Sequence, residues 1–398
     1  MRVLHITPGL AERVGGPPQV AVGLCKGLAK AGVDVTLYTT NFDYEGTLDV
    51  PIGVPIEQDG FRTYYFNVKS PKRFIFSPEL GRAVRGTISH FDLVHIHGLW
   101  LYTNLIGAYF AQRKKVPYVV RPRGNLTRLA LAQNWWLKQL YRWVIEGRNL
   151  NKAAALHCVG ANEFKEVQKL GYGGTVVMVP NGVDLIAEGE LSRCRGTFRE
   201  AHPETAGKRL VLFVGRISPL KGLDRLCDAF ALLARDLEDV HLAIVGCDNE
   251  GYMGRLRKPL RTCGVAHRVT FTGFLRGPEK IAALADADIF CMPSYQDVGA
   301  IALREAMVCG LPAVVSREVA SDLPERIRSQ GCCVDRKGTS AGLAAALSRV
   351  LENRKDAERI AKSAKQLMME KYTWDAIAHC MMDVYERIVG LSTGPYES

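Results

Sequence analysis

The chain has 398 residues, which is enough for two domains of ordinary size. Hydrophobic residues account for 47% and charged residues for 23% of the sequence, the profile of a soluble globular protein, and no apolar run is long enough to span a bilayer. The net charge of +11 is compatible with nucleic acid, anionic lipid or a phosphorylated substrate as a partner, or with a basic solvated face.

The first residues and the cysteines indicate a cytoplasmic protein. The sequence enters a strand at once, without the pattern of a signal peptide. Its 11 cysteines include no CxxC pair, so we interpret them as reduced thiols, mostly small core residues, and expect no structural zinc site.

The N-terminal stretch predicts a β-α-β unit with a glycine loop. Residues 3–7 and 33–39 read as apolar strands, and apolar residues recur every four positions over 19–30, which is typical of a helix packed on a sheet. Gly15 and Gly16 lie in the loop before that helix. There the backbone can approach a ligand closely and free N–H groups favour an anion, although the pattern is not GxGxxG.

Two further strands are followed by residues that can carry chemistry. The strand at 92–96 is followed by His97, and the strand at 117–120 by Arg123. His95 and His97 are two residues apart, as in some metal sites, but no carboxylate or cysteine is near them in sequence, so we expect no metal there. We interpret His95 as structural and His97 as a group at a strand's carboxyl end, facing a cleft.

A basic segment with aromatic residues comes next. Between Arg113 and Arg148 there are nine Lys or Arg and a single acid, Glu146. Trp136 and Trp143 fall within this segment and can share one face of a helix. Aromatic residues beside basic ones suit a membrane interface or a lipid-linked substrate. The alternative is a helix whose aromatic residues belong to the core.

The alternation of strands and helices stops after 176–179 and restarts at 209. Residues 185–208 are polar and irregular, so we expect a linker at 186–208 between a first domain over 1–185 and a second over 209–374. The second half predicts another open, doubly wound parallel sheet, with helices between strands at 210–214, 241–245, 269–272, 288–292 and 312–316.

The turn after the first of these strands carries two cations. Residues 210–214 are wholly apolar and predict a strand buried on both faces. Arg216 and Lys221 follow in a short loop before a helical pattern over 223–234. Fixed cations at the carboxyl end of a parallel strand, beside a helix N-terminus, suit a diphosphate. A solvated turn that happens to hold two basic residues is the alternative.

Two carboxylates follow the predicted strand at 288–292. Asp297 lies in the next loop and Glu305 within the helix after it. Because they are eight residues apart, the loop must fold back if they are to share one site. A carboxylate within a helix is usually solvated, but one that faces a cleft can accept two hydrogen bonds from a ribose diol.

Taken in order, these motifs resemble those of glycosyltransferases of the GT-B type, family 4, over nearly the whole chain. The marks are Val14-Gly15-Gly16, His95-Ile96-His97-Gly98, Val179-Pro180-Asn181-Gly182-Val183-Asp184, Val214-Gly215-Arg216 with Lys221-Gly222, Phe271-Thr272-Gly273-Phe274, and Pro293-Ser294-Tyr295 running to Glu305-Ala306-Met307. The resemblance implies an α/β protein with two Rossmann-like, doubly wound parallel-sheet domains facing a cleft. It also implies a final helix, at about 375–398, that returns to the first domain.

The resemblance further implies roles for the marked residues. Arg216 and Lys221 would hold the diphosphate of a nucleotide-sugar donor and stabilise its departure, so no metal and no other cofactor would be needed. Asp297 would complete this catalytic set at the donor sugar, and Glu305 would bind the ribose. The remaining donor contacts that it implies are Gly273 and Phe274 near the base, and Gly15 and Gly16 at the phosphate.

The sequence departs from the family pattern in two places. Where the family has E-G-F-G before the glutamate, this chain has Asp297-Val298-Gly299-Ala300. Asp is one methylene shorter than Glu, and Ala300 resists the positive φ that glycine adopts readily. Arg123 stands where many relatives have a histidine before glycine. An arginine cannot act as a general base, but it can pair with a phosphate of the acceptor.

Together these features predict a cytoplasmic, retaining glycosyltransferase, placed at the inner face of the membrane if the basic segment contacts lipid. It would move a hexose from a UDP- or GDP-hexose to a glycan or lipid-linked glycan in polysaccharide biosynthesis, with His97 and Arg123 on the acceptor side. The changed loop from Asp297 to Ala300 favours a second hypothesis, a nucleotide-sugar-binding subunit with impaired catalysis. Charge alone would suggest a nucleic-acid binder, a partner that we do not expect.

Overall fold

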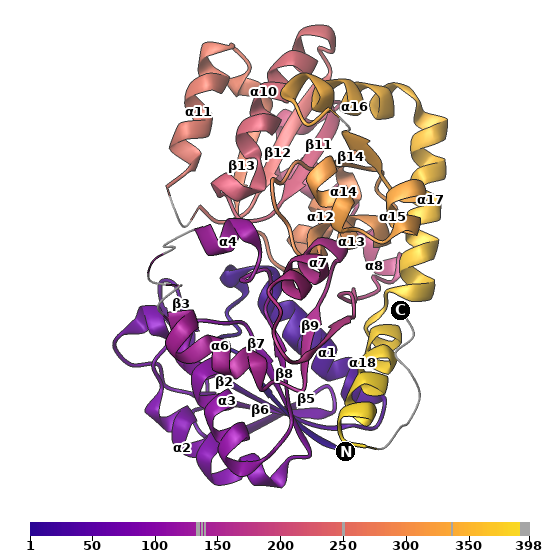
Figure 1. Cartoon of the computed structure of the whole chain (residues 1–398). Coiled ribbons are helices and arrows are strands. Elements are labelled where there is room, and N and C mark those ends of the chain that lie inside the picture. The colour runs from indigo at the N-terminus through magenta and orange to yellow at the C-terminus, as the bar shows by residue number, and fades with distance from the viewer. Residues whose placement is uncertain (133–135, 137, 139–140, 249–250, 336, 391–398) are drawn as a thin grey trace. The chain divides into compact units, whose positions relative to one another are not determined.

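The computed structural model describes residues 1–132, 136, 138, 141–248, 251–335 and 337–390. The chain divides into two compact units, which Figure 1 shows coloured along the chain. The first comprises Met1–Gly182 and Trp374–Ser398, and the second comprises Val183–Thr373.

Among the described residues, the first unit contains a mixed sheet of eight strands in the order β10-β9-β8-β7-β1-β2-β6-β5. All neighbours pair in parallel except β5 and β6. The strands are β1 Arg2–Ile6, β2 Asp34–Thr40, β5 Pro55–Gln58, β6 Phe61–Phe66, β7 Leu93–His97, β8 Tyr118–Arg121, β9 Ala155–Cys158 and β10 Thr175–Met178. A small ribbon pairs β3 Phe42–Asp43 with β4 Gly46–Thr47.

The helices of the first unit cover the sheet on its two faces, so β1, β7 and β8 are almost continuously buried. They are α1 Gly16–Lys30, α2 Pro78–Thr87, α3 Tyr102–Lys114, α4 Arg128–Ala132, α6 Gly147–Asn151, α7 Ala161–Lys169 and α18 Trp374–Ile388, with a π-helical turn at Arg142–Glu146. Short 3-10 turns lie at Glu12–Val14, Lys72–Phe74 and Ile88–His90.

Helix α18, the last of the described helices, packs on α1 within the first unit. Its first residue, Trp374, lies so close to α1 that a Cβ added at Gly23 would come 2.2 Å from the Trp374 ring. Lys30 and Asp375 form an ion pair beside this contact. Glycines on α1 therefore make the groove into which the C-terminal helix fits.

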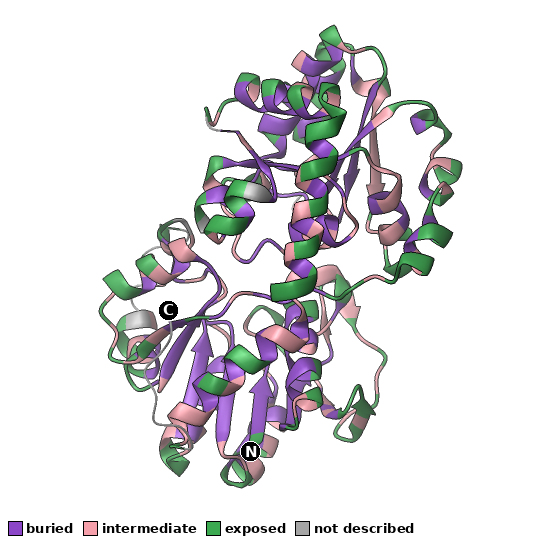
Figure 2. Ribbon diagram, turned by 90° about the vertical axis from the view of Figure 1, so that its right-hand side faces the viewer, coloured by how far each residue is buried: buried purple, intermediate pink, exposed green. Residues whose placement is uncertain are grey.

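The second unit contains a parallel sheet, with six strands in its described residues, in the order β13-β12-β11-β14-β15-β16. The strands are β11 Arg209–Val214, β12 Val240–Val245, β13 Val269–Gly273, β14 Ile289–Met292, β15 Ala313–Ser316 and β16 Cys333–Asp335. In Figure 2 most strands of the two sheets carry the colour of buried residues, whereas the outer faces of many helices are exposed.

Helices flank this second sheet on both faces. They are α8 Glu188–Cys194, α9 Thr197–Ala201, α10 Leu223–Asp236, α11 Met253–Thr262, α12 Gly277–Asp286, α13 Ile301–Val308, α14 Arg317–Asp322, α15 Glu325–Gln330, α16 Ser340–Glu352 and α17 Arg354–Lys371. Short 3-10 turns lie at Pro203–Thr205, Pro219–Lys221 and Ala266–Arg268.

The expected linker at 186–208 is wrong, because these residues fold as part of the second unit. Helices α8 and α9 pack on α12 and bury Leu191 and Phe198, each 3% exposed. The carboxylate of Asp286 accepts hydrogen bonds from the backbone N–H groups of Gly196, Phe198 and Arg199. The change of unit occurs instead between Gly182 and Val183.

Both sheets share one strand order. Numbered along each unit's parallel strands, β13-β12-β11-β14-β15-β16 and β6-β2-β1-β7-β8-β9 both follow 3-2-1-4-5-6, the order of a Rossmann fold, and β10 extends the first sheet beyond β9. The order reverses between β11 and β14 in the second unit and between β1 and β7 in the first. Ligands of open α/β sheets bind outside the carboxyl ends of the strands at this switch point.

Candidate active site

Six of the predicted site residues follow or end the strands at the switch points of the two sheets, whereas Arg123 follows β8 and Gly273 ends β13. In the second unit, Arg216 and Lys221 follow β11 and Asp297 follows β14. In the first unit, the loop after β1 leads to Gly15 and Gly16, and His97 is the last residue of β7. The two halves belong to different units.

A glycine brings the two loops of the second unit together. Gly222, between the 3-10 turn Pro219–Lys221 and α10, has φ 64°. A Cβ at this position would lie 2.2 Å from the carbonyl oxygen of Pro293, the residue after β14. Only glycine therefore permits this backbone contact, which sets Lys221 beside the loop that holds Asp297.

Lys221 and Asp297 form a partly buried ion pair. Their Nζ and Oδ2 atoms are 2.5 Å apart, and the side chains are 19% and 11% exposed. The structure thus brings these two predicted residues into contact. A lysine ammonium has three N–H donors, so the pair leaves donors for a further acceptor such as a phosphate oxygen. Arg216 is exposed, and no salt bridge among the described residues involves it.

The loop after β14 adopts positive φ at two successive residues, although alanine, the second of them, resists this conformation. Gly299 has φ 87°, and Ala300 has φ 41° and ψ 51°, which is the left-handed region. Ala300 caps α13 and is only 2% exposed. An L-residue with a Cβ is disfavoured there by roughly 1–2 kcal/mol, so the surrounding packing must hold the loop in this form.

Two buried arginines, which sequence reasoning missed, help to hold the loop. Arg304 is 1% exposed, donates from Nε to the carbonyl oxygen of Gly299 at 3.2 Å, and lies 4.6 Å from the ring centroid of Tyr372. Arg225 donates to the carbonyl oxygen of Pro293 and lies over the ring of Tyr295. Both arginines lie on the buried faces of helices. The sequence around them gave no signal of Tyr372 or Pro293 as a partner, because these residues are far along the chain.

The other residues predicted to bind the nucleotide-sugar donor in the second unit have partners other than Lys221 and Asp297. Glu305, on α13, pairs with Lys280 of α12 at 2.6 Å, and each side chain is 18% exposed. Sequence reasoning did not single out Lys280. Gly273 ends β13 with φ 77° and is exposed, and the ring of Phe274 lies 5.7 Å from the Arg276 guanidinium.

In the first unit, the glycine loop leads into helix α1, whose first turn has few free backbone N–H donors. Gly15 is its N-cap, with φ 95°, and Gly16 is its first residue. Pro17 and Pro18 follow, and neither has a backbone N–H. Since the free N–H groups of a helix's first turn are what attract an anion, α1 offers only part of the usual set.

Arg123 supplies a cation to this same loop. Its Nη2 lies 3.3 Å from Oγ1 of Thr7 and 3.4 Å from the carbonyl oxygen of Pro17, at the start of α1. Arg123 and Gly124 both have positive φ, 56° and 77°. The buried carboxylate of Glu163 accepts the Gly124 N–H at 2.5 Å, which holds the turn after β8 in place.

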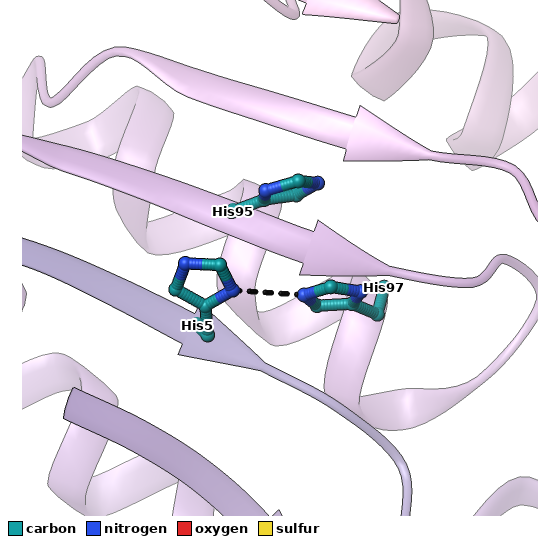
Figure 3. Close-up of side chains that lie close together, drawn as sticks. All are labelled: His5, His95 and His97. Atoms are coloured by element: carbon teal, nitrogen blue, oxygen red, sulfur yellow. Dashed lines mark hydrogen bonds between the residues drawn. The ribbon is translucent and has the colours of Figure 1, made fainter. Parts of the chain in front are cut away.

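His97 ends β7 as expected, but its side chain does not face open space. It is 0% exposed and shares a 2.9 Å hydrogen bond between its Nε2 and Nδ1 of His5, as Figure 3 shows. His95 is also 0% exposed, and its ring stacks on that of His97 with centroids 4.5 Å apart. Burial, together with the positive charge of Arg121, lowers the pKa of His5 to about 3.

The three histidines have nitrogen atoms within 4.8 Å of one another, a spacing that would allow a metal ion. Their orientation does not suit one. Each imidazole lone pair lies in its ring plane, and the planes of His95 and His97 differ by only 12° in a stacked pair, so the two lone pairs cannot converge on one ion. Burial lowers the pKa of both rings well below the usual value, which makes them neutral.

The basic aromatic segment is only partly described, since 133–135, 137 and 139–140 lie outside the described residues. The interpretation of its aromatic side chains as core is wrong for Trp136 and Trp143, whereas the ring of Tyr141 packs against Trp100 with centroids 5.9 Å apart. Trp136 is 68% and Trp143 is 86% exposed, and Val144 beside them is 56% exposed. None of the helices in the part of the chain that the structure describes has the length and apolar character needed to cross a membrane.

Comparison with known proteins identifies the same division of the chain. The family model described as "Glycosyl transferase 4-like domain" matches residues 15–182, and that described as "Glycosyl transferases group 1" matches 195–367. An uncharacterised glycosyltransferase of Methanocaldococcus jannaschii is 28% identical over 97% of this chain and 98% of its own.

Two further similarities involve proteins with named donors. A GDP-mannose-dependent alpha-(1-6)-phosphatidylinositol dimannoside mannosyltransferase of Mycobacterium tuberculosis is 31% identical over 56% of this chain and 55% of its own. The solved structure of HepE of Anabaena in complex with UDP-glucose has a TM-score of 0.74 and 18% identity, over 97% of this chain and all of that one. The chain therefore belongs to the group 1, family 4 glycosyltransferases: it has the GT-B fold of two Rossmann-like parallel-sheet domains and transfers sugar from a nucleotide-sugar donor.

Proposed function

We propose that the protein is a retaining hexosyltransferase that moves a hexose from a UDP- or GDP-hexose to a glycan acceptor in polysaccharide biosynthesis. The observation that carries the proposal is the Lys221–Asp297 pair at the switch point of the second sheet, with Arg216 exposed on the same turn. Both cations follow β11, at the strand end where this class of sheet binds nucleotides.

Arg216 and Lys221 would act on the diphosphate that leaves during transfer. Negative charge develops there as the glycosyl bond breaks, and fixed cations that are already aimed at it stabilise the transition state without reorganisation. Asp297 orients the Lys221 ammonium and would face the donor sugar. Glu305, held by Lys280, would accept hydrogen bonds from the ribose, with Gly273 and Phe274 near the base. The first unit would add Gly15, Gly16 and Arg123 at the phosphate and acceptor side.

The donor is proposed from two relatives that differ in their base. HepE was solved with UDP-glucose, and the mycobacterial relative is named for GDP-mannose. A thermal-shift screen with UDP, GDP, ADP and their common hexose conjugates would identify the base. The same screen would then choose the donor for a turnover assay, in which free nucleotide is measured with and without candidate glycan acceptors.

The acceptor is proposed to be a glycan, including a lipid-linked one at the inner face of the membrane. Trp136, Trp143 and Val144 are exposed in a basic segment, an arrangement that favours an interface with anionic lipid. Flotation with anionic and with zwitterionic vesicles tests it. Trp143→Ser should weaken binding to anionic vesicles, whereas Tyr109→Ser, at another exposed aromatic residue of the first unit (49% exposed), should not.

A second candidate, a nucleotide-sugar-binding subunit with impaired catalysis, is favoured by the strained Ala300 and the shorter carboxylate of Asp297. It predicts saturable binding of a nucleotide or its sugar conjugate without release of free nucleotide under any acceptor condition. Nucleotide release above the rate without enzyme, together with a product whose one-bond C1–H1 coupling shows the anomeric configuration of the donor, would exclude it.

A further inference from the structure

Five buried aromatic side chains of the first unit form a chain of hydrogen bonds that crosses three strands and helix α18. Each is at most 1% exposed: His5 on β1, His95 and His97 on β7, His157 on β9, and Tyr385 on α18. The contacts, in order, are His157 Nε2 to Val179 O at 2.8 Å, His157 Nδ1 to His95 Nε2 at 3.4 Å, His95 Nδ1 to Tyr385 Oη at 2.5 Å, Tyr385 Oη to His5 Nε2 at 3.5 Å, and His5 Nδ1 to His97 Nε2 at 2.9 Å.

One end of this chain has a fixed direction. A carbonyl oxygen can only accept, so the Nε2 of His157 must carry the proton that it gives to Val179. A neutral imidazole has one donor and one acceptor nitrogen, so Nδ1 of His157 accepts from Nε2–H of His95. The Nδ1 of His95 is then an acceptor as well, and it receives the hydroxyl proton of Tyr385.

The direction continues from Tyr385 to His97. The Tyr385 hydroxyl donates its only hydrogen to His95, so its oxygen presents only lone pairs to Nε2 of His5. Nε2 is therefore the nitrogen of His5 that carries the proton and donates it to this oxygen. Nδ1 of His5 then accepts from Nε2–H of His97. The Tyr385–His5 contact is long, but the opposite order would set two lone pairs against each other there.

The far nitrogen of His97 supports the same order. Among the described residues no group bonds to its Nδ1, which lies on the opposite side of the ring from His5 (Figure 3). In the opposite order this atom would be a buried N–H without an acceptor, and orphaned N–H groups are rarer in proteins than orphaned acceptors. An unpaired lone pair on Nδ1 of His97 is therefore less costly than an unpaired N–H at the same atom.

We infer that this chain fixes His97 in the tautomer with a proton on Nε2, so that its Nδ1 at the carboxyl end of β7 can only accept a hydrogen bond. Tyr385 and His157 are positioning residues for that nitrogen, although they lie away from it. The consequence for binding rests on the proposed function: Nδ1 is buried here, so a ligand group can meet it only where the residues above it move aside, and that group must then be an O–H or N–H donor, such as a sugar hydroxyl.

The tautomer can be measured without any substrate, so this test is independent of the proposed activity. The protein has nine histidines, and labelling their rings with ¹⁵N allows long-range ¹H–¹⁵N correlation spectra, with His97→Gln used to assign the signals of His97. The expected result is a single neutral tautomer with an unprotonated Nδ1. A protonated Nδ1, or an equal mixture of tautomers, would overturn the inference, and so would one equivalent of tightly bound metal found by elemental analysis.

Tyr385→Phe tests the path of the chain, because it removes the donor to His95 and the acceptor for His5 while keeping the ring. We expect the His97 signals to move toward the average of two tautomers. Tyr38→Phe, which removes another buried hydroxyl of the first unit, bonded to Thr87, should leave them unchanged. Unchanged His97 signals in Tyr385→Phe would contradict the inference.

A second pair of variants keeps the test open should Tyr385→Phe fold poorly. His157→Gln can still donate to Val179 and accept from His95, so His97 should keep its tautomer. His157→Leu removes the anchor, and we expect mixed tautomers at His95 and at His97. If both variants gave the same His97 spectrum as the unaltered protein, the direction of the chain would not originate at Val179 and the inference would fail.

Discussion

The ammonium of Lys221 lies 2.5 Å from the carboxylate of Asp297, although the two residues are separated by 76 positions in the sequence. They meet because β11 and β14 are neighbours at the switch point of the second sheet, and because Gly222 lets the turn after β11 touch the backbone after β14. This contact sets a cation where a Rossmann sheet binds phosphate.

Loss of the Lys221 ammonium should affect turnover far more than stability. Removing one preorganised donor to a developing anion costs roughly 2.7–4 kcal/mol, so Lys221→Ala should lower kcat by at least about a hundredfold. Steady-state release of free nucleotide from the identified donor measures this. Lys208→Ala removes an exposed charge just before β11 and should retain full turnover. A Lys221→Ala protein with near-normal turnover would exclude the assigned role.

Ala300→Gly should stabilise the second unit. The left-handed conformation costs an alanine roughly 1–2 kcal/mol. The added freedom of glycine in the unfolded chain costs about 0.4–1 kcal/mol. The net gain should raise the Tm by a few degrees in calorimetry. In the matched control Ala345→Gly, at an exposed position inside α16, the same change should instead cost about 1 kcal/mol. A lower Tm for Ala300→Gly would show that the strain is not present.

Gly23 and Trp374 should be energetically coupled. A Cβ at Gly23 would meet the Trp374 ring, so Gly23→Ala should destabilise the first unit, whereas Trp374→Ala alone should cost about 3–5 kcal/mol through loss of a large buried ring. In the double variant the alanine at 23 should be tolerated. A thermal-unfolding double-mutant cycle measures the coupling, and additive effects of the two changes would contradict this packing.

The buried histidines should make the first unit less stable as the pH falls. Burial lowers the pKa of His5 and His157 to about 3, below the usual value of 6.5. The unfolded chain therefore binds more protons between these values, and stability is lost as the pH falls from about 6.5 toward 3. From pH 7 to 5 the loss should be roughly 2 kcal/mol for each such histidine.

Tryptophan fluorescence can follow this loss in the first unit alone, because all five tryptophans belong to it. Urea unfolding at pH 7 and pH 5 should show a smaller difference for His157→Gln than for the unaltered protein. His267→Gln, at an exposed position of the second unit, should not change that difference. An equal pH dependence in His157→Gln would mean that this ring is not the source.

The sequence predicts the strands well where they are wholly apolar, as at 210–214, because burial on both faces allows little else there. It predicts the helices α8 and α9 poorly, since each buries only one or two side chains and the rest of the segment is polar. The unfavourable conformation of Ala300 could be predicted from the sequence, because the family pattern has a glycine at that position. The structure then gives the φ of Ala300 as 41°.

Partners that are distant in sequence could not be predicted. Lys280 pairs with Glu305 across 25 positions of the sequence, and His5 meets His97 only because β1 and β7 pair at register His5 to His95. The strand order that makes these contacts is a property of the whole sheet and has no local signature. For the same reason the sequence could not show that His97 is buried.

The most direct test of the phosphate site is a thermal-shift titration with UDP and with GDP, compared between the unaltered protein and the double variant Arg216→Ala, Lys221→Ala. A ligand at one hundred times its Kd stabilises a protein by about 2.7 kcal/mol, so one of the two nucleotides should raise the Tm in a dose-dependent way. The double variant leaves the Asp297 carboxylate without its partner and should start from a lower Tm, but it should show no shift with nucleotide. An equal shift in both proteins, or none in the unaltered one, would contradict a diphosphate site at the end of β11.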